Sequence, residues 1–122
     1  MNVPDFIARQ FYVTGSLRNN DDGFQLEAHN PMGNGVLVGV GRLRVDGRDI
    51  DPADVSAQRP GEEPIQANDV TNERPIPVRV GDRVVLKVAG QRLEPGQHEL
   101  EVMLYEVNLG RLSFKIRDQL AE

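Results

Sequence analysis

The chain has 122 residues, of which 39% are hydrophobic, and a formal net charge of −5 at pH 7. This length predicts one domain with a single packed core that needs no disulfide or metal to fold. The absence of cysteine excludes disulfides and thiolate metal sites, and the interspersed acidic charge argues against nucleic-acid binding, which needs a positive face.

The first residues, MNVPDFIARQFYVTGS, lack the basic start and apolar run of a secretory signal. Nowhere does an apolar stretch approach the length that spans a bilayer. We therefore expect a soluble, cytoplasmic protein that does not associate with membranes.

The first half of the chain predicts short strands separated by polar turns. Residues 6–14 fit either an opening strand or a short helix, and a strand follows in which Phe24, Leu26 and Ala28 alternate with polar residues. The next run, VLVGVGRLRV, changes its apolar face near Gly39 and Gly41, which predicts a β-bulge. The dipeptide Asp46-Gly47 then predicts a tight hairpin.

Residues 51–77 differ in character, because five prolines and many polar residues interrupt the apolar pattern. We predict one helical turn at 52–54 and, for the rest, a long loop of the kind that often carries binding functions. A mobile surface loop without a binding function is an equally good interpretation. The whole chain, 1–122, is accordingly predicted to be one domain with a long proline-rich loop near 51–77.

The last part of the chain shows the strongest strand signals. Alternating apolar residues predict three strands, with buried faces made by the following residues: Val84, Leu86 and Val88; Leu100, Val102 and Leu104; and Leu112, Phe114 and Ile116. Seven or eight short strands without a long helix predict an all-β fold, an immunoglobulin-like, Greek-key antiparallel β-sandwich. After Pro95-Gly96, His98 occupies the place of a corner aromatic that hydrogen-bonds back to the corner backbone, so we assign it a structural role.

The sequence contains no self-contained active site. His29 and His98 have no second ligand at helical or hairpin spacing, and the acidic pairs lie in polar turns where they stay solvated. The segment GNGVLVGVG leads into a strand rather than a helix, so it does not fit a phosphate-binding loop. We predict no catalytic residue, metal site or cofactor on this chain.

Several residues that we expect to be exposed form the candidate partner interface. Methionine and tyrosine are typical of interface cores, and the loop 30–35, the proline-rich segment and one late strand supply apolar groups. Ordinary loop packing is the alternative explanation. The candidates are Pro31, Met32, Asn34, Arg74, Pro75 and Tyr105.

The order of landmarks resembles one known family. These landmarks are DGFQL at 22–26, LRVDGRDI at 43–50, VGD at 80–82, LEPGQHELEV at 93–102 and NLGRLSFKIRD at 108–118. In this order they resemble the beta subunit of C-glycoside deglycosidases over nearly the whole chain. The resemblance implies a small non-catalytic subunit of a carbon–carbon lyase, which completes the active site of a TIM-barrel alpha subunit holding a divalent metal, such as manganese. The substrate it implies is a 3-oxo-C-glycoside of an aromatic aglycone, for example a flavonoid.

Two other functions fit the residues without that resemblance. One is a stand-alone immunoglobulin-like module that binds carbohydrate or protein. The other is a small enzyme with a metal held by His29, His98 and acidic residues brought together by folding.

Overall fold

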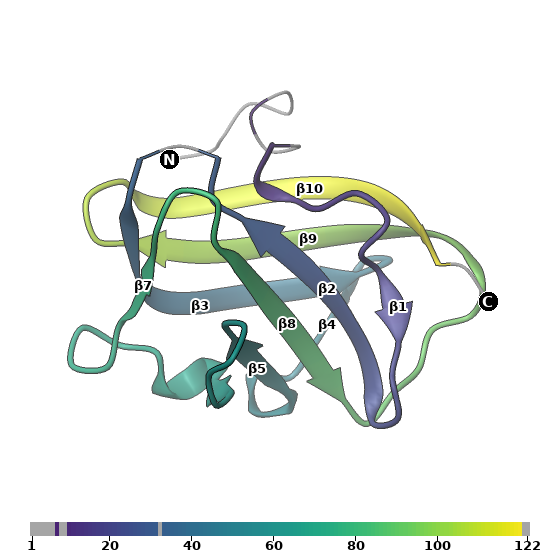
Figure 1. Ribbon diagram of the computed structural model, residues 1–122. Helices are drawn as coiled ribbons and strands as arrows, with labels where there is room; N and C mark the ends of the chain where they lie inside the picture. Colours follow the sequence, from purple (N-terminus) through teal and green to yellow (C-terminus); the bar gives the residue numbers. More distant parts are fainter. Residues whose placement is uncertain (1–6, 8–9, 32, 121–122) are drawn as a thin grey trace.

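Two antiparallel sheets face each other in the computed structural model of the chain, which describes residue 7 and residues 10–31 and 33–120 (Figure 1). The first sheet has the strand order β1-β2-β8-β5-β6. Its strands are β1 (Arg18–Asn19), β2 (Gly23–His29), β5 (Val55–Gln58), β6 (Ile65–Gln66) and β8 (Arg83–Ala89).

The second sheet has the order β10-β9-β3-β4, and β7 also pairs with β3. Its strands are β3 (Gly35–Val45), β4 (Arg48–Asp49), β7 (Ile76–Val78), β9 (Gly96–Glu106) and β10 (Gly110–Leu120). The predicted all-β, antiparallel β-sandwich is confirmed. The immunoglobulin-like and Greek-key assignments, and the division of 1–122 into one domain, stay predictions.

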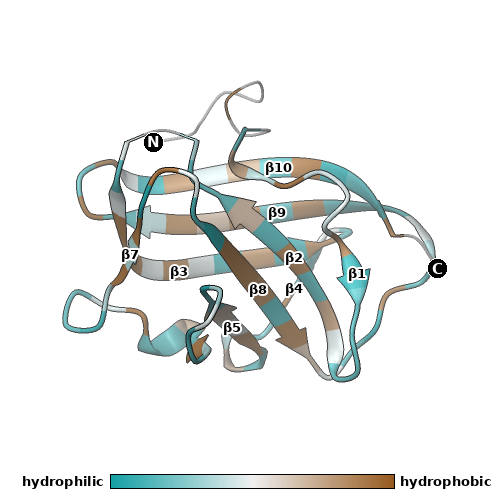
Figure 2. Cartoon of the chain, in the orientation of Figure 1, coloured by the Kyte–Doolittle hydropathy of each residue, from teal (hydrophilic) through white to brown (hydrophobic). Residues whose placement is uncertain are grey.

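The predicted alternation of the late strands is confirmed by burial. Leu100 and Val102 on β9 and Phe114 on β10 are at most 5% exposed, and all three point between the sheets. In β2, Phe24 and Leu26 are fully buried and pack opposite them. Figure 2 shows the resulting alternation of hydrophobic and hydrophilic residues along the strands. Period-two patterning therefore sets which face of each sheet forms the core.

The predicted bulge in β3 is also confirmed. The register of β3 against β9 shifts between Leu37 and Gly39 and again between Val40 and Leu43. Gly39 also lies close beneath the Tyr105 ring, since a Cβ there would come within 3.0 Å of a ring carbon of Tyr105. The predicted hairpin at Asp46-Gly47 joins β3 to β4, with both residues at positive φ, 52° and 82°.

Residues 51–77 are more regular than the predicted long loop. The segment contains β5, β6, the start of β7 and two short 3-10 helices, η1 (Pro52–Asp54) and η2 (Ala67–Asp69). The predicted helical turn at 52–54 is η1. Val55 and Ala57 are buried and pair with β8, which places β5 inside the first sheet. The pattern V-S-A-Q is too short to reveal this strand, because only two of its residues face the core.

A buried carboxylate fastens the opening segment to the last strand. Of residues 6–14, for which a strand and a helix were both open, Ile7, Gln10 and Phe11 are helical and Tyr12 forms an isolated bridge with Ala28, while Phe6 lies outside the described residues. The Tyr12 hydroxyl donates a hydrogen bond to the buried Asp118 carboxylate on β10.

The same oxygen of Asp118 also accepts a bond from the Gly15 backbone N–H at 3.0 Å. Burial, followed by the bond to Asp118, raises the pKa of Tyr12 above its ordinary value, so the hydroxyl stays protonated and remains a donor. This arrangement closes the edge of the sandwich between β2 and β10.

Replacing Phe114 by alanine should lower the free energy of unfolding by about 3–5 kcal/mol, because it leaves a cavity between the sheets. Replacing its neighbour Lys115 by alanine should change the free energy of unfolding by less than about 0.5 kcal/mol, because Lys115 is exposed on the opposite face. Urea denaturation of both variants measures the difference. Equal midpoints would show that the assigned facing of β10 is wrong.

Replacing Tyr12 by phenylalanine should cost about 1–3 kcal/mol, because the buried Asp118 carboxylate loses its hydroxyl donor. Tyr105→Phe is the matched control, since the Tyr105 hydroxyl is exposed and bonds to the Met103 sulfur at 3.5 Å. Thermal unfolding of both variants gives the comparison. A Tyr12→Phe protein as stable as the control would show that the hydrogen bond from Tyr12 to Asp118 does not stabilise the fold.

Candidate binding cavity at one end of the sandwich

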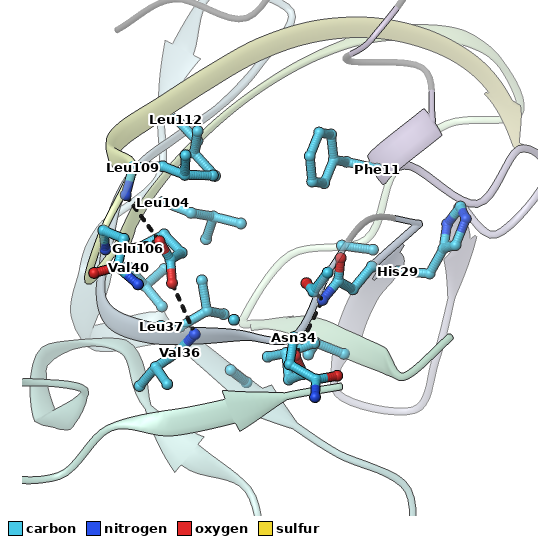
Figure 3. Close-up of a pocket in the computed structure, with 18 of the residues that line it drawn as sticks. Phe11, His29, Asn34, Val36, Leu37, Val40, Leu104, Glu106, Leu109 and Leu112 are labelled. Atoms are coloured by element: carbon cyan, nitrogen blue, oxygen red, sulfur yellow. Dashed lines mark hydrogen bonds between the residues drawn. The ribbon is translucent and has the colours of Figure 1, made fainter. Parts of the chain in front are cut away.

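An apolar cavity of about 310 Å³ opens at the end of the sandwich where β2, β3 and β9 meet their adjoining loops (Figure 3). Its walls come from both sheets. The apolar lining consists of Phe11, Ala28, Val36, Leu37, Val40, Ala57, Val78, Val84, Leu86, Leu104, Leu109 and Leu112. Polar residues and glycines at the strand ends and in the adjoining loops complete the lining: His29, Asn30, Asn34, Glu106 and Asn108, with Gly33 and Gly35.

Small residues explain why this end of the core is hollow. Positions where other strands place valine or leucine carry Ala28 on β2 and Ala57 on β5, and both line the cavity. The glycines of the loop 33–35 add no side chain to fill the remaining space. Interiors are otherwise packed to the density of organic crystals, so a hollow of this size lined by aliphatic groups can receive an apolar group from outside.

Glu106, at the end of β9, is a structural anchor for the cavity wall. One carboxylate oxygen accepts a bond from the Val36 N–H at 2.9 Å, and the other accepts bonds from the N–H groups of Asn108 and Leu109 at 2.8 Å each. Burial alone would raise the pKa of Glu106, but these backbone donors outweigh it and lower the pKa below its ordinary value. The carboxylate therefore stays ionised, and its oxygens are engaged in hydrogen bonds with the backbone. These two properties make it unsuited to act as a general acid.

Asparagine side chains hold the two loops at the cavity mouth together. The Asn30 amide nitrogen donates to the carbonyl oxygens of Gly33 at 2.9 Å and Val78 at 3.0 Å. The Asn34 side-chain oxygen accepts a bond from the Val80 N–H at 3.1 Å. The loop after β2 and the turn between β7 and β8 thus form one polar rim at the cavity mouth.

His29 contributes little to the interior of the cavity. Figure 3 shows its ring pointing away from the space between the sheets, as expected for a residue next to the inward-facing Ala28 on β2. Its Nδ1 atom is buried without a hydrogen-bond partner among the described residues.

His98 is held in a network at the opposite end of β9. Its Nδ1 lies 2.6 Å from a carboxylate oxygen of Asp46, and its Nε2 lies 2.7 Å from the Glu94 carbonyl oxygen. Burial would lower the pKa of His98, but the Glu94 carbonyl and the Asp46 carboxylate outweigh it and raise the pKa. Because both ring nitrogens face acceptors, the protonated ring satisfies both contacts.

A metal held jointly by His29 and His98 has no support in this geometry. Both nitrogens of His98 are already engaged, and in the described part of the chain no group of three or more histidine, cysteine or acidic side chains gathers to hold an ion.

The structure places the predicted interface residues in three different locations. Asn34 lines the cavity and Pro31 lies in the same loop, while Met32 falls outside the described residues. Arg74 and Pro75 are exposed in the turn before β7, where Arg74 and Thr71 bond each other's backbone. Tyr105 lies on the outer face of the second sheet above Gly39 and Gly41.

Sequence reasoning missed most of the cavity, because its lining residues read as ordinary core. Two signals were present in the sequence. Ala28 ends the inward series of β2 with a small residue, and Glu106 interrupts the apolar series of β9 at an inward position. Such a buried acid needs a cluster of donors, and the N–H groups of the following turn supply it.

Comparison with known proteins gives one family. The family model described as hydroxymethylglutaryl-CoA reductase, N-terminal domain, matches residues 7–121. No curated protein matches the chain. Across the described residues, no helix has the length and hydrophobicity required to cross a membrane.

This match overturns the resemblance to the C-glycoside deglycosidase beta subunit. The predicted role as a subunit of a carbon–carbon lyase acting on 3-oxo-C-glycosides of flavonoids is therefore wrong. The quoted landmarks misled because they are turn signals: Asp46-Gly47 makes a tight hairpin and Gly96 takes positive φ at a corner, as such residues do in many unrelated sandwiches. The manganese-dependent TIM-barrel partner was implied by that resemblance alone.

The free energy of unfolding should fall as the pH rises above about 6.5, the ordinary pKa of histidine, because the folded structure raises the pKa of the His98 ring. A raised pKa in the folded state makes the contribution of His98 complete below the pKa of the unfolded chain and lost as the pH passes the folded value. Asp46, whose pKa is lowered by its bonds to the Glu99 N–H and to His98, loses its contribution only in acid.

Urea denaturation across this pH range, with His98→Gln as the comparison, measures the effect. His29 is present in both proteins, so the difference between the two curves isolates His98. Parallel curves would show that the His98 contacts do not stabilise the fold.

Proposed function

The chain belongs to the hydroxymethylglutaryl-CoA reductase N-terminal domain family, and from this we propose that it is an accessory binding domain that works beside a separate catalytic unit. The family description names a domain of a reductase, so the reduction of hydroxymethylglutaryl-CoA is the activity to which we connect it. The chain contributes a binding surface, while the reacting groups and any cofactor belong to the catalytic partner.

The observation that supports this proposal is the apolar cavity, in which backbone hydrogen bonds engage the Glu106 carboxylate. Glu106 is the acid that lines the hollow, and backbone N–H groups engage both of its oxygens. The cavity presents aliphatic side chains and uncharged amide groups to a bound molecule. These groups suit binding rather than acid–base chemistry. A cytoplasmic location remains part of the proposal, and the lack of cysteine suits a reducing compartment.

The test is to purify the tagged chain from its own host and to measure hydroxymethylglutaryl-CoA reduction by the isolated chain and by the chain with its co-eluting proteins. We expect the activity only in the complex, together with a native mass larger than that of the chain. The free tag is the control for adventitious capture. An isolated chain that turns over this substrate, or one that remains alone in the extract, would overturn the proposal.

A further inference from the structure

The walls of the apolar cavity are braced by hydrogen bonds, so the hollow is formed before anything binds. Glu106 accepts bonds from the Val36 N–H on β3 and from two N–H groups of the turn after β9. The Asn30 amide fastens the loop after β2 to the end of β7 through the Val78 carbonyl oxygen. An empty hollow costs stability, and sites for small molecules are usually largely pre-formed. A braced hollow therefore favours a space that is used over a packing defect.

The cavity has the size and the walls to hold one ring. Phe11 and Leu104 face the same space from opposite sides (Figure 3). The Phe11 ring packs against the Phe114 ring, with centroids 6.5 Å apart and an angle of 19° between the planes, which fixes its orientation. A volume of about 310 Å³ exceeds the roughly 150 Å³ hollow that accepts benzene. There is room for a ring with a short substituent, and Phe11 offers a surface on which a planar group can stack.

The charges around the cavity select for a neutral ligand. Among the described residues that line the hollow, Glu106 carries the only carboxylate and none is a lysine or arginine. The carboxylate would repel an anion, and a cation would have to shed its water beside oxygens that already accept backbone N–H groups. The turn at the mouth does carry Arg79 and Asp82, but neither lines the cavity. Their charges stand at the entrance, outside the space that the apolar body of a ligand would fill.

Uncharged amide groups stand where the cavity opens. Asn34 in the loop before β3 and Asn108 in the turn after β9 both belong to the lining. An amide side chain both donates and accepts hydrogen bonds. These two residues can therefore bond one uncharged polar group, such as a hydroxyl or a carbonyl, at the outer end of a ligand.

We propose that the cavity binds a small neutral molecule, with a compact apolar body about the size of one substituted ring and one uncharged hydrogen-bonding group directed to the mouth. The inference rests on the proposed binding function and adds the chemical class of the ligand. Apolar contact supplies the affinity, while the amides set the orientation of the ligand and the cost of burying a charge sets its selectivity.

The test is a nuclear magnetic resonance titration of the purified chain with benzyl alcohol, benzoate and benzylammonium, which share one ring and differ in charge. Benzyl alcohol should bind with a dissociation constant in the millimolar range or tighter, and the two ions should bind at least about tenfold more weakly. The methyl resonances of Leu37, Val40 and Leu104 should shift, since these side chains line the hollow.

Two variants that carry the same change test whether the hollow is the site. Ala28→Leu fills the cavity from inside and should weaken the binding of benzyl alcohol about tenfold or more. Ala89→Leu adds the same side chain at the exposed far end of β8 and should bind within about twofold of the original chain. The methyl shifts locate the ligand in the unaltered chain as well, so the test does not depend on the folding of Ala28→Leu.

Each outcome bears on a different claim. Binding of benzyl alcohol at the lining methyl groups, with weaker binding of both ions, supports the proposal. An ion that binds as tightly as the alcohol overturns the ligand class. Lining resonances that do not shift with any probe, or full binding by a folded Ala28→Leu protein, overturn the site itself. The accessory role in the reduction is decided separately, by the activity of the complex, in which none of these probes takes part.

Discussion

Two facing layers of aliphatic side chains hold the sheets together, and the shape of the molecule follows from how completely they fill the space between them. Over most of the sandwich the filling is complete, with Phe24, Leu26 and Leu100 fully buried. At one end, alanines and glycines take the places of larger residues, and the sheets enclose a hollow instead of a core. This hollow departs from the close packing of protein interiors, and it is the basis of the proposed binding function.

Buried polar groups serve the same architecture by closing its open edges. Asp118 ties the opening segment to β10, Glu106 ties the start of β3 to the turn after β9, and His98 ties the corner before β9 to the β3–β4 hairpin. Backbone N–H groups satisfy most of the contacts of Asp118 and Glu106, whereas His98 contacts one backbone carbonyl and the Asp46 carboxylate. Buried groups of this kind are stable only when their partners are in place, so they stabilise one arrangement of the loops rather than several.

The strands could be predicted from the sequence where the alternation is long, as in 100–104 and 112–116, and where glycine marks a turn or bulge, as at Gly39 and Gly47. The strand β5 could not be predicted in this way, because only two of its residues face inward, and two residues do not establish a period. The cavity is a property of the space between strands distant in the sequence, such as β2 and β9. Pattern reasoning assigns Leu104 and Leu86 to a core without showing that the core is incomplete.

Family assignment failed for a related reason. Turn residues recur wherever a sandwich needs a tight hairpin or corner, so the order of V-D-G and P-G-x-H describes an architecture more than an ancestry. The match over residues 7–121 draws on the whole chain instead. The acid at 106 and the small residue at 28 both line the cavity, where this sandwich departs from a filled core.

The most direct test of the account is xenon binding, followed by crystallography under xenon pressure, because xenon enters accessible apolar hollows. The account predicts xenon between Leu37, Val40 and Leu104, and none there in Ala28→Leu. A crystal structure in which these side chains close on one another, with no xenon between the sheets, would contradict it.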